Sequence, residues 1–275
     1  MYIRWGSRRR CQQGQPKKAN WYKRLNGMIT IGGRAHTIEE LLEVAKLGYP
    51  FVEISLDDPT TVAGWIPRLR EIKDTYGISF FAHYPNEDNP FAVDVLRKKF
   101  LPRIKTLMDL SRQLDITKAT LHFWIDQRWA PADLIPGKLE LLSRIVDYGN
   151  EYGIIICIEN LSERTESFGP AFDAIPDLRM TLDIRHAQLL SQQNTSFRFI
   201  EDHFSKIVHL HVHDNRGGTS VKDDLHLPLG EGIVDYPAIM ASLMKKGYDS
   251  TVTIEVKPKD MFRTRKALED CIRRI

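Results

Sequence analysis

The chain has 275 residues, of which 42% are hydrophobic and 27% are charged, and its formal net charge is +3. This composition is typical of a soluble globular protein, and no apolar run is long enough to predict a membrane span. The three cysteines, Cys11, Cys157 and Cys271, form no CxxC pair, which argues against a cysteine zinc site or a disulfide framework and favours a cytoplasmic protein.

Residues 1–27 carry eight basic residues and no acidic one. The other 31 basic and 36 acidic residues give residues 28–275 a net charge of about −5. Because residues 1–27 show no apolar periodicity, we expect a basic, disordered extension outside the core, of a kind that could hold nucleic acid. Alternatively, Met28 is the natural start and the extension is upstream sequence.

From residue 28, short β-branched runs alternate with helical stretches. Several helical stretches end in glycine, as at Gly77 and Gly153, which is how a helix stops on a left-handed residue. The first run contains no GxGxxG loop, so a dinucleotide-binding open sheet is not favoured. Eight strand and helix pairs predict an α/β fold, a single-domain (β/α)8 TIM barrel over residues 28–275. The predicted strands cover 29–33, 51–55, 78–83, 118–123, 154–160, 179–184, 207–212 and 251–256.

The seventh run, SKIVHLHVHDN, carries histidines at alternate positions. Alternate side chains of a strand share a face, so His209, His211 and His213 point one way and the apolar residues between them point the other way. A single histidine in such a place is most often a hydrogen-bonded core residue. Whether these three histidines have a different role depends on which residues stand at the ends of the other strands.

Metal-ligand side chains close the third to the eighth predicted strands or follow them directly. In a TIM barrel the catalytic groups lie at these C-terminal ends, whereas satisfied core residues would include Ser, Thr and Asn. Imidazole and carboxylate are the ligands that zinc, manganese and iron prefer, so the pattern predicts a divalent metal site. The nine residues are His83, His122, Glu159, Asp183, His186, His211, Asp224, His226 and Glu255.

The motifs AHYP, TLHFW, CIEN, LDIRHA, HVHD, DLHLPLGEGIVDY and TIEV resemble, in this order, those of the xylose isomerase-like TIM-barrel superfamily, or AP endonuclease family 2. This superfamily contains sugar and sugar-phosphate isomerases and epimerases together with endonuclease IV. The resemblance implies that Glu159, Asp183, His211 and Glu255 ligate the single metal of the epimerases. It also implies that all nine residues match the positions that hold three zinc ions in the nuclease.

The resemblance also separates the three histidines of the seventh strand. His211 is the expected ligand, while His209 lies one pleat deeper in the barrel interior and His213 lies beyond His211, near the mouth. For His209 and His213 we expect a structural role or a role in supporting the ligand.

Two reactions fit these residues. In a divalent-metal-dependent isomerase or epimerase of a small sugar, sugar phosphate or polyol, Glu159 and Glu255 are catalytic base and acid in proton transfer through an enediolate. One ion (Zn, Mn, Mg, Co or Fe) is expected there, and the remaining five residues bind substrate or further metal. The alternative is an endonuclease IV-like phosphodiesterase with up to three zinc ions acting on abasic DNA, the only case in which nucleic acid is a partner. The acidic core and Asn86, where the nuclease family has tyrosine, favour the sugar reaction.

Three further residues could contact a substrate. They are Glu53 at the end of the second strand, Trp124 after the fourth and Arg216 after the seventh. Each also has a structural alternative. Glu53 could anchor a backbone amide, Trp124 could pack over the barrel rim, and Arg216 could stand in a plain surface turn. The sequence thus predicts a small sugar-like partner and no membrane, and it leaves homo-oligomer formation open.

Overall fold

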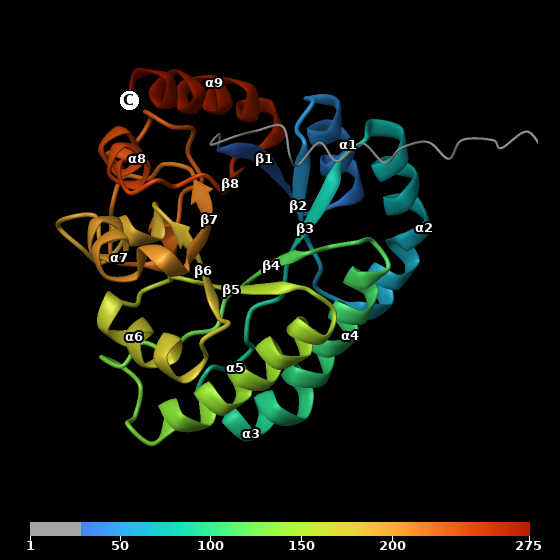
Figure 1. Ribbon diagram of the computed structural model, residues 1–275, viewed down its shortest axis with the longest axis vertical. Coiled ribbons are helices and arrows are strands. Elements are labelled where there is room, and N and C mark those ends of the chain that lie inside the picture. The colour runs from blue at the N-terminus through green and yellow to red at the C-terminus, as the bar shows by residue number, and fades with distance from the viewer. Residues whose placement is uncertain (1–28) are drawn as a thin grey trace, which may run out of the picture.

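The computed structural model describes residues 29–275, and the extension expected over residues 1–27 lies outside this part. Eight parallel strands pair in chain order, and the last pairs with the first, so that the sheet closes into a barrel. Figure 1 shows the strands at the centre and the helices around them. The predicted (β/α)8 TIM barrel is therefore confirmed.

Strands and helices alternate along most of the described chain. The strands are β1 (Thr30–Ala35), β2 (Phe51–Ser55), β3 (Ser79–His83), β4 (Lys118–Leu121), β5 (Ile155–Glu159), β6 (Arg179–Asp183), β7 (Ile207–Val212) and β8 (Thr251–Ile254). The α-helices of residues 29–275 are α1 (Ile38–Lys46), α2 (Pro59–Tyr76), α3 (Val93–Val95), α4 (Leu101–Arg112), α5 (Leu134–Glu151), α6 (Thr165–Ala174), α7 (Ser196–His203), α8 (Tyr236–Lys245) and α9 (Pro258–Arg274).

Capping groups define where these helices begin and end. The Asp58 side chain caps α2, because its Oδ1 accepts a hydrogen bond of 2.8 Å from the amide of Thr61. The same helix ends at Gly77, which has a φ of 64°, and Gly153 after α5 has a φ of 68°. Both glycines thus take the left-handed conformation predicted for them.

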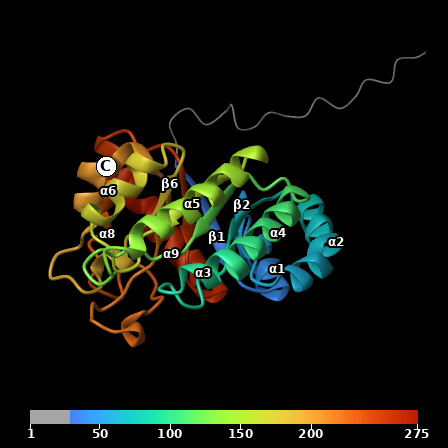
Figure 2. The same cartoon turned by 90° about the horizontal axis from the view of Figure 1, so that it is seen from below.

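The helices cover the outside of the barrel. In the view at a right angle (Figure 2), α1, α2 and α4 lie towards one side and α6 and α8 towards the other. Most of these helices bury apolar side chains against the barrel, as α1 does with Leu41 and Val44, which are fully buried. Within residues 29–275, no helix has the length and apolar character needed to cross a membrane.

The interior of the barrel is polar towards the mouth, and this explains the alternation of the strand sequences. On β2, Val52 and Ile54 belong to the apolar core beneath the helices, whereas Glu53 is bonded to residues across the interior. Most parallel sheets are apolar on both faces and their strands read as continuous apolar runs. In this barrel the alternation of polar and apolar residues along a strand therefore identifies the interior side chains that can form a site.

Towards the opposite end, aromatic rings fill the interior. The ring of Phe51 lies 4.5 Å from that of Phe81, measured between centroids, and 6.2 Å from that of His209. Gly32 on the neighbouring β1 makes room for Phe51, since a Cβ at this position would lie 2.3 Å from the ring. Glycine is needed here because the ring of Phe51 packs directly against the backbone of β1.

Replacing Gly32 by alanine should lower the free energy of unfolding by about 1–3 kcal/mol, because the buried ring of Phe51 must shift. Urea unfolding followed by circular dichroism measures this change. The matched control is Gly64→Ala in α2, where a Cβ would meet no atom within 4 Å. That substitution should raise stability by about 0.5–1 kcal/mol, and an unchanged unfolding midpoint for Gly32→Ala would contradict the packing argument.

Candidate functional site

A cavity of about 440 Å³ opens at the C-terminal ends of the strands. Its volume is in the range of small-molecule binding sites. The end of nearly every strand, or the loop after it, contributes to the wall. The side chains with which the chemistry can be built include Arg34, His83, His122, Glu159, His186 and Glu255.

The carboxylate of Glu159, at the end of β5, is the centre of the site. Its Oε2 lies 2.8 Å from Nε2 of His122 and 3.4 Å from Nε2 of His83. Its Oε1 lies 3.1 Å from Nδ1 of His186 and 3.2 Å from Nδ1 of His211. Five of the nine predicted residues therefore meet around one buried carboxylate.

Asp183 is held rigidly at the end of β6. The backbone amides of Arg185 and His186 donate to its Oδ1 at 2.7 and 2.8 Å, so the chain folds around the carboxylate in LDIRHA. The side-chain amide of Asn160, in the motif CIEN, bonds to both backbone groups of Asp183 at 2.9 Å. The other oxygen, Oδ2, faces the interior and lies 2.9 Å from Nε2 of His213.

Glu255 follows β8 and faces both histidines at the end of β7. Its Oε1 lies 3.5 Å from Nδ1 of His211, and its Oε2 lies 3.5 Å from Nε2 of His213. The guanidinium of Arg34, on β1, forms an ion pair of 3.0 Å with Oε1. Through His213, which is fully buried between the two carboxylates, Glu255 connects to Asp183.

These carboxylates stay ionised although they are buried. Burial raises the pKa of Glu159, but the positive charges of His211 and His122 outweigh burial and hold that pKa well below its usual range. The pKa of Glu255 falls to about 2 in the same way, where His211 opposes burial most strongly. Burial lowers the pKa of His211, but the surrounding carboxylates, Glu255 first, raise it well above its ordinary value. The protein thus gathers positive charge at His211 to balance the carboxylates.

The geometry of His211 fits a divalent metal ion. Its Nε2 lies 3.0 Å from Oε2 of Glu53, and because an ionised carboxylate can only accept, this nitrogen carries the hydrogen. In the neutral ring, Nδ1 then has a lone pair that faces oxygens of Glu159 and Glu255 at 3.2 and 3.5 Å. Three electron-pair donors converge on one point, which only a proton or a metal cation can stabilise. One imidazole with several carboxylates is a donor set that zinc and manganese accept.

Arg185 separates the last predicted ligands from one another. Its Nη2 lies 2.7 Å from Nε2 of His186, and its Nη1 contacts the carboxylate of Asp224. His226 lies 3.7 Å from Asp224, and the two side chains are 45% and 38% exposed. A fixed guanidinium therefore stands between His186 and the pair Asp224 and His226, where a metal shared by all three would have to lie.

Two of the residues expected to contact a substrate do not line the cavity. Glu53 is 0% exposed and bonds to His209, His211 and Thr253, so it is neither a wall of the pocket nor a backbone anchor. The sequence predicted its place on the second strand correctly, but it did not predict its partners on β7 and β8. Arg216 is exposed and lies outside the residues that line the cavity, because the chain turns outward after Asn215.

Trp124 lies beside the cavity, in a neighbouring hollow that it shares with His122 and Leu161. Its indole nitrogen donates to Ser162 at 3.1 Å, which ties the loop after β4 to the loop after β5. Trp129 is 64% exposed at the rim. A substrate contact by Trp124 stays a prediction.

Sequence reasoning missed Arg34 and Arg185. The first strand was expected to end at residue 33, two residues before its real end, which hid that Arg34 points into the interior at the mouth. Arg185 stands within LDIRHA, but arginine is usually an exposed residue and no local pattern marks it as buried. The spacing of Asp183 and His186 was the only signal that could have drawn attention to it.

A family model described as "Xylose isomerase-like TIM barrel" matches residues 41–274. The chain belongs to this family. An uncharacterized protein of Methanocaldococcus jannaschii is 26% identical over 220 residues, which cover 74% of this chain and 74% of that protein. Fructoselysine 3-epimerase of Escherichia coli O157:H7 is 23% identical over 250 residues, covering 84% and 89%.

Solved structures share the family fold at low sequence identity. A D-tagatose 3-epimerase-like protein has a TM-score of 0.76 at 24% identity, covering 89% of this chain and 97% of that chain. The IolI protein with a bound zinc atom has a TM-score of 0.72 at 14% identity, covering 89% and 98%. These similarities establish the architecture, while the chemistry has to be argued from the site.

The protein should hold about one divalent ion per chain after loading with zinc or manganese and dialysis, because Glu159 and Glu255 converge on Nδ1 of His211 and the guanidinium of Arg185 fills the space between His186 and Asp224. Elemental analysis with independent protein quantification measures this ratio. The variant His211→Ala should lose the ion. His203→Ala is the matched control, since this histidine lies on α7 and bonds to the backbone oxygen of Thr165. Three zinc ions per chain would contradict the expectation.

Proposed function

We propose that the protein is a divalent-metal-dependent isomerase or epimerase of a small sugar, sugar phosphate or polyol. The observation that supports this most strongly is the pair of carboxylates, Glu159 and Glu255, that face the same nitrogen of His211 at 3.2 and 3.5 Å. Glu159 ends β5, Glu255 directly follows β8, and both line the cavity of about 440 Å³. Two carboxylates on opposite sides of a substrate can act as the general base and the general acid in proton transfer at a carbon centre.

Each carboxylate has a distinct task in this proposal. One of Glu159 and Glu255 removes the proton from the carbon beside the substrate carbonyl, and the other returns a proton to complete the reaction. A divalent ion held by Glu159, Asp183, His211 and Glu255 would supply electrophilic stabilisation of the negative charge on the substrate oxygens.

One neutral histidine beside Glu159, His83, can hold a hydroxyl group of a sugar. Burial, followed by the charge of Arg34, lowers the pKa of His83 to about 4, so this ring is neutral at physiological pH. Its Nδ1 donates to the backbone oxygen of Tyr84 at 3.1 Å, so Nε2 carries a lone pair beside Oε2 of Glu159, 3.4 Å away, and can accept from a substrate hydroxyl. His122 lies beside it, with ring centroids 4.7 Å apart.

The names of similar proteins support the reaction type. The Escherichia coli relative is a fructoselysine 3-epimerase, and one protein of the same fold is a D-tagatose 3-epimerase-like protein. Both names specify epimerisation at the third carbon. The zinc atom in the IolI structure supports the requirement for a metal. Ketoses and their phosphates are therefore the first substrates to test.

Two contacts weigh against the endonuclease IV-like alternative. This chain has Asn86 where the nuclease family has tyrosine. The nearby Tyr84 does not replace that tyrosine, because its hydroxyl turns away from the cavity and bonds Ser111 at 3.0 Å. Arg185 occupies the space between His186 and Asp224 that a third metal would need.

Metal-loaded protein should interconvert at least one pair of ketoses or ketose phosphates, detected by chromatography or NMR. The variants Glu159→Gln and Glu255→Gln should each reduce kcat by about 10²–10⁴-fold at saturating metal, because each removes a proton-transferring group. Glu140→Gln, on the exposed face of α5, is the matched control and should leave kcat unchanged. The proposal is wrong if both folded site variants turn over an identified substrate as fast as the wild type, or if abasic DNA is cleaved and no ketose reacts.

A further inference from the structure

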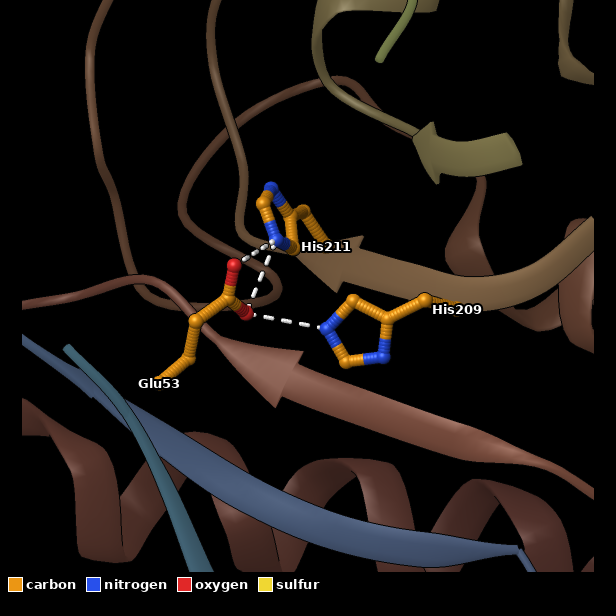
Figure 3. Close-up of side chains that lie close together, drawn as sticks. All are labelled: Glu53, His209 and His211. Carbon is orange, nitrogen blue, oxygen red and sulfur yellow. Dashed lines mark hydrogen bonds and ion pairs between the residues drawn. The ribbon is translucent and has the colours of Figure 1, made fainter. Parts of the chain in front are cut away.

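Glu53 lies directly beneath His211, outside the cavity. Its Oε2 accepts from Nε2 of His209 at 2.9 Å, from Nε2 of His211 at 3.0 Å and from the hydroxyl of Thr253 at 2.7 Å. Figure 3 shows the carboxylate between the two imidazole rings, which come from alternate positions of β7. The mechanism of the proposed reaction assigns no task to this buried charge.

A directed hydrogen-bond chain leads to Glu53 from the deeper part of the barrel. It starts at Lys118 on β4, whose ammonium can only donate and lies 2.7 Å from the hydroxyl of Thr251. The hydroxyl hydrogen of Thr251 then bonds Nδ1 of His209 at 2.7 Å, which is much closer than its other acceptor, the backbone oxygen of Val208 at 3.4 Å. With Nδ1 as acceptor, the neutral ring of His209 carries its hydrogen on Nε2 and donates it to Glu53.

The contacts of Glu53 agree with this direction. Its Oε2 lies 2.7 Å from the hydroxyl of Thr253, 2.9 Å from Nε2 of His209 and 3.0 Å from Nε2 of His211. A carboxylate offers only lone pairs to such neighbours, so both imidazoles present their N–H groups to Glu53.

Glu53, His209 and His211 lie close enough together to be read as a second metal site. The hydrogen-bond pattern argues against this reading. Oε2 of Glu53 already has three donors, among them the hydroxyl of Thr253, and Nδ1 of His209 is occupied by Thr251. The cluster is closed by hydrogen bonds, and the free electron pair of His211 points the other way, towards Glu159 and Glu255.

We infer that Glu53 is a positioning residue that holds His211 in the Nε2–H form and aims its Nδ1 at the metal. Carboxylates that accept the second N–H of a ligating histidine fix the ring orientation and strengthen the histidine as a ligand. The inference rests on the proposed metal dependence and extends it to a buried residue that does not line the cavity. Glu53 is itself held in place by the hydrogen-bond chain that runs from Lys118 through Thr251 to His209.

The test is the metal affinity of the purified protein, measured with zinc or manganese against a chromophoric chelator and without any substrate. Glu53→Gln keeps the size of the side chain but turns one acceptor into a donor that faces other donors. Its affinity should fall by about 10–100-fold, and the visible spectrum of the cobalt-loaded variant should shift because the ligand field of His211 changes.

Glu163→Gln is the matched control. Glu163 is equally buried and accepts from the backbone amides of Ile125 and Leu161 at 2.9 Å, but it contacts no predicted metal ligand among the described residues. This variant should lose stability while its metal affinity and cobalt spectrum stay as in the wild type. A loss of stability alone therefore cannot mimic the effect expected for Glu53→Gln.

The outcomes separate this inference from the proposed function. Wild-type affinity and spectrum in folded Glu53→Gln would overturn the role of Glu53 and leave the metal site intact. A wild-type protein that binds no divalent ion would overturn the proposed function, and the role of Glu53 would fall with it. If Glu53→Gln does not fold, Thr253→Val decides, since it removes one donor to Glu53 and should weaken metal binding in the same direction by a smaller factor.

Discussion

The ionised carboxylate of Glu159, buried at the barrel mouth, is the feature on which the rest of the site depends. Burying a charge is costly unless hydrogen bonds and opposite charges surround it. Four imidazoles lie within 3.4 Å of its two oxygens. Glu255 and Asp183 add further negative charge close by, so the mouth favours a cation at its centre. In the absence of metal, a proton on His211 meets this need.

The register of the strands places some of these groups side by side. Asp183 on β6 is paired with His211 on β7, and on the other side of the barrel Arg34 on β1 is paired with Glu53 on β2. Because side chains alternate, the residue one pair deeper on β7 is His209, which joins the support beneath the site. The barrel therefore holds its reactive groups and their supporting groups in successive interior layers of the same rigid sheet.

The fold and the meeting of histidines and carboxylates at the mouth could be predicted, because both follow from period-two alternation and from what stands at each strand end. The role of Glu53 beneath the site could not be predicted, since its partner His209 lies 156 residues further along the chain. Arg34 was hidden by a strand boundary that was placed two residues too early. The guanidinium of Arg185 between His186 and Asp224 depends on loop conformation, which no local pattern determines.

The central claim, proton transfer at a carbon centre by Glu159 and Glu255, is tested most directly by solvent exchange. Metal-loaded protein is incubated in D₂O with ketoses and their phosphates, and the recovered sugars are analysed by NMR and mass spectrometry. We predict one deuterium at the carbon beside the carbonyl in the product, and none when Glu159→Gln replaces the wild type. A product formed at the wild-type rate without deuterium, or deuterium uptake unaffected by Glu159→Gln, would contradict the proposed roles of the two carboxylates.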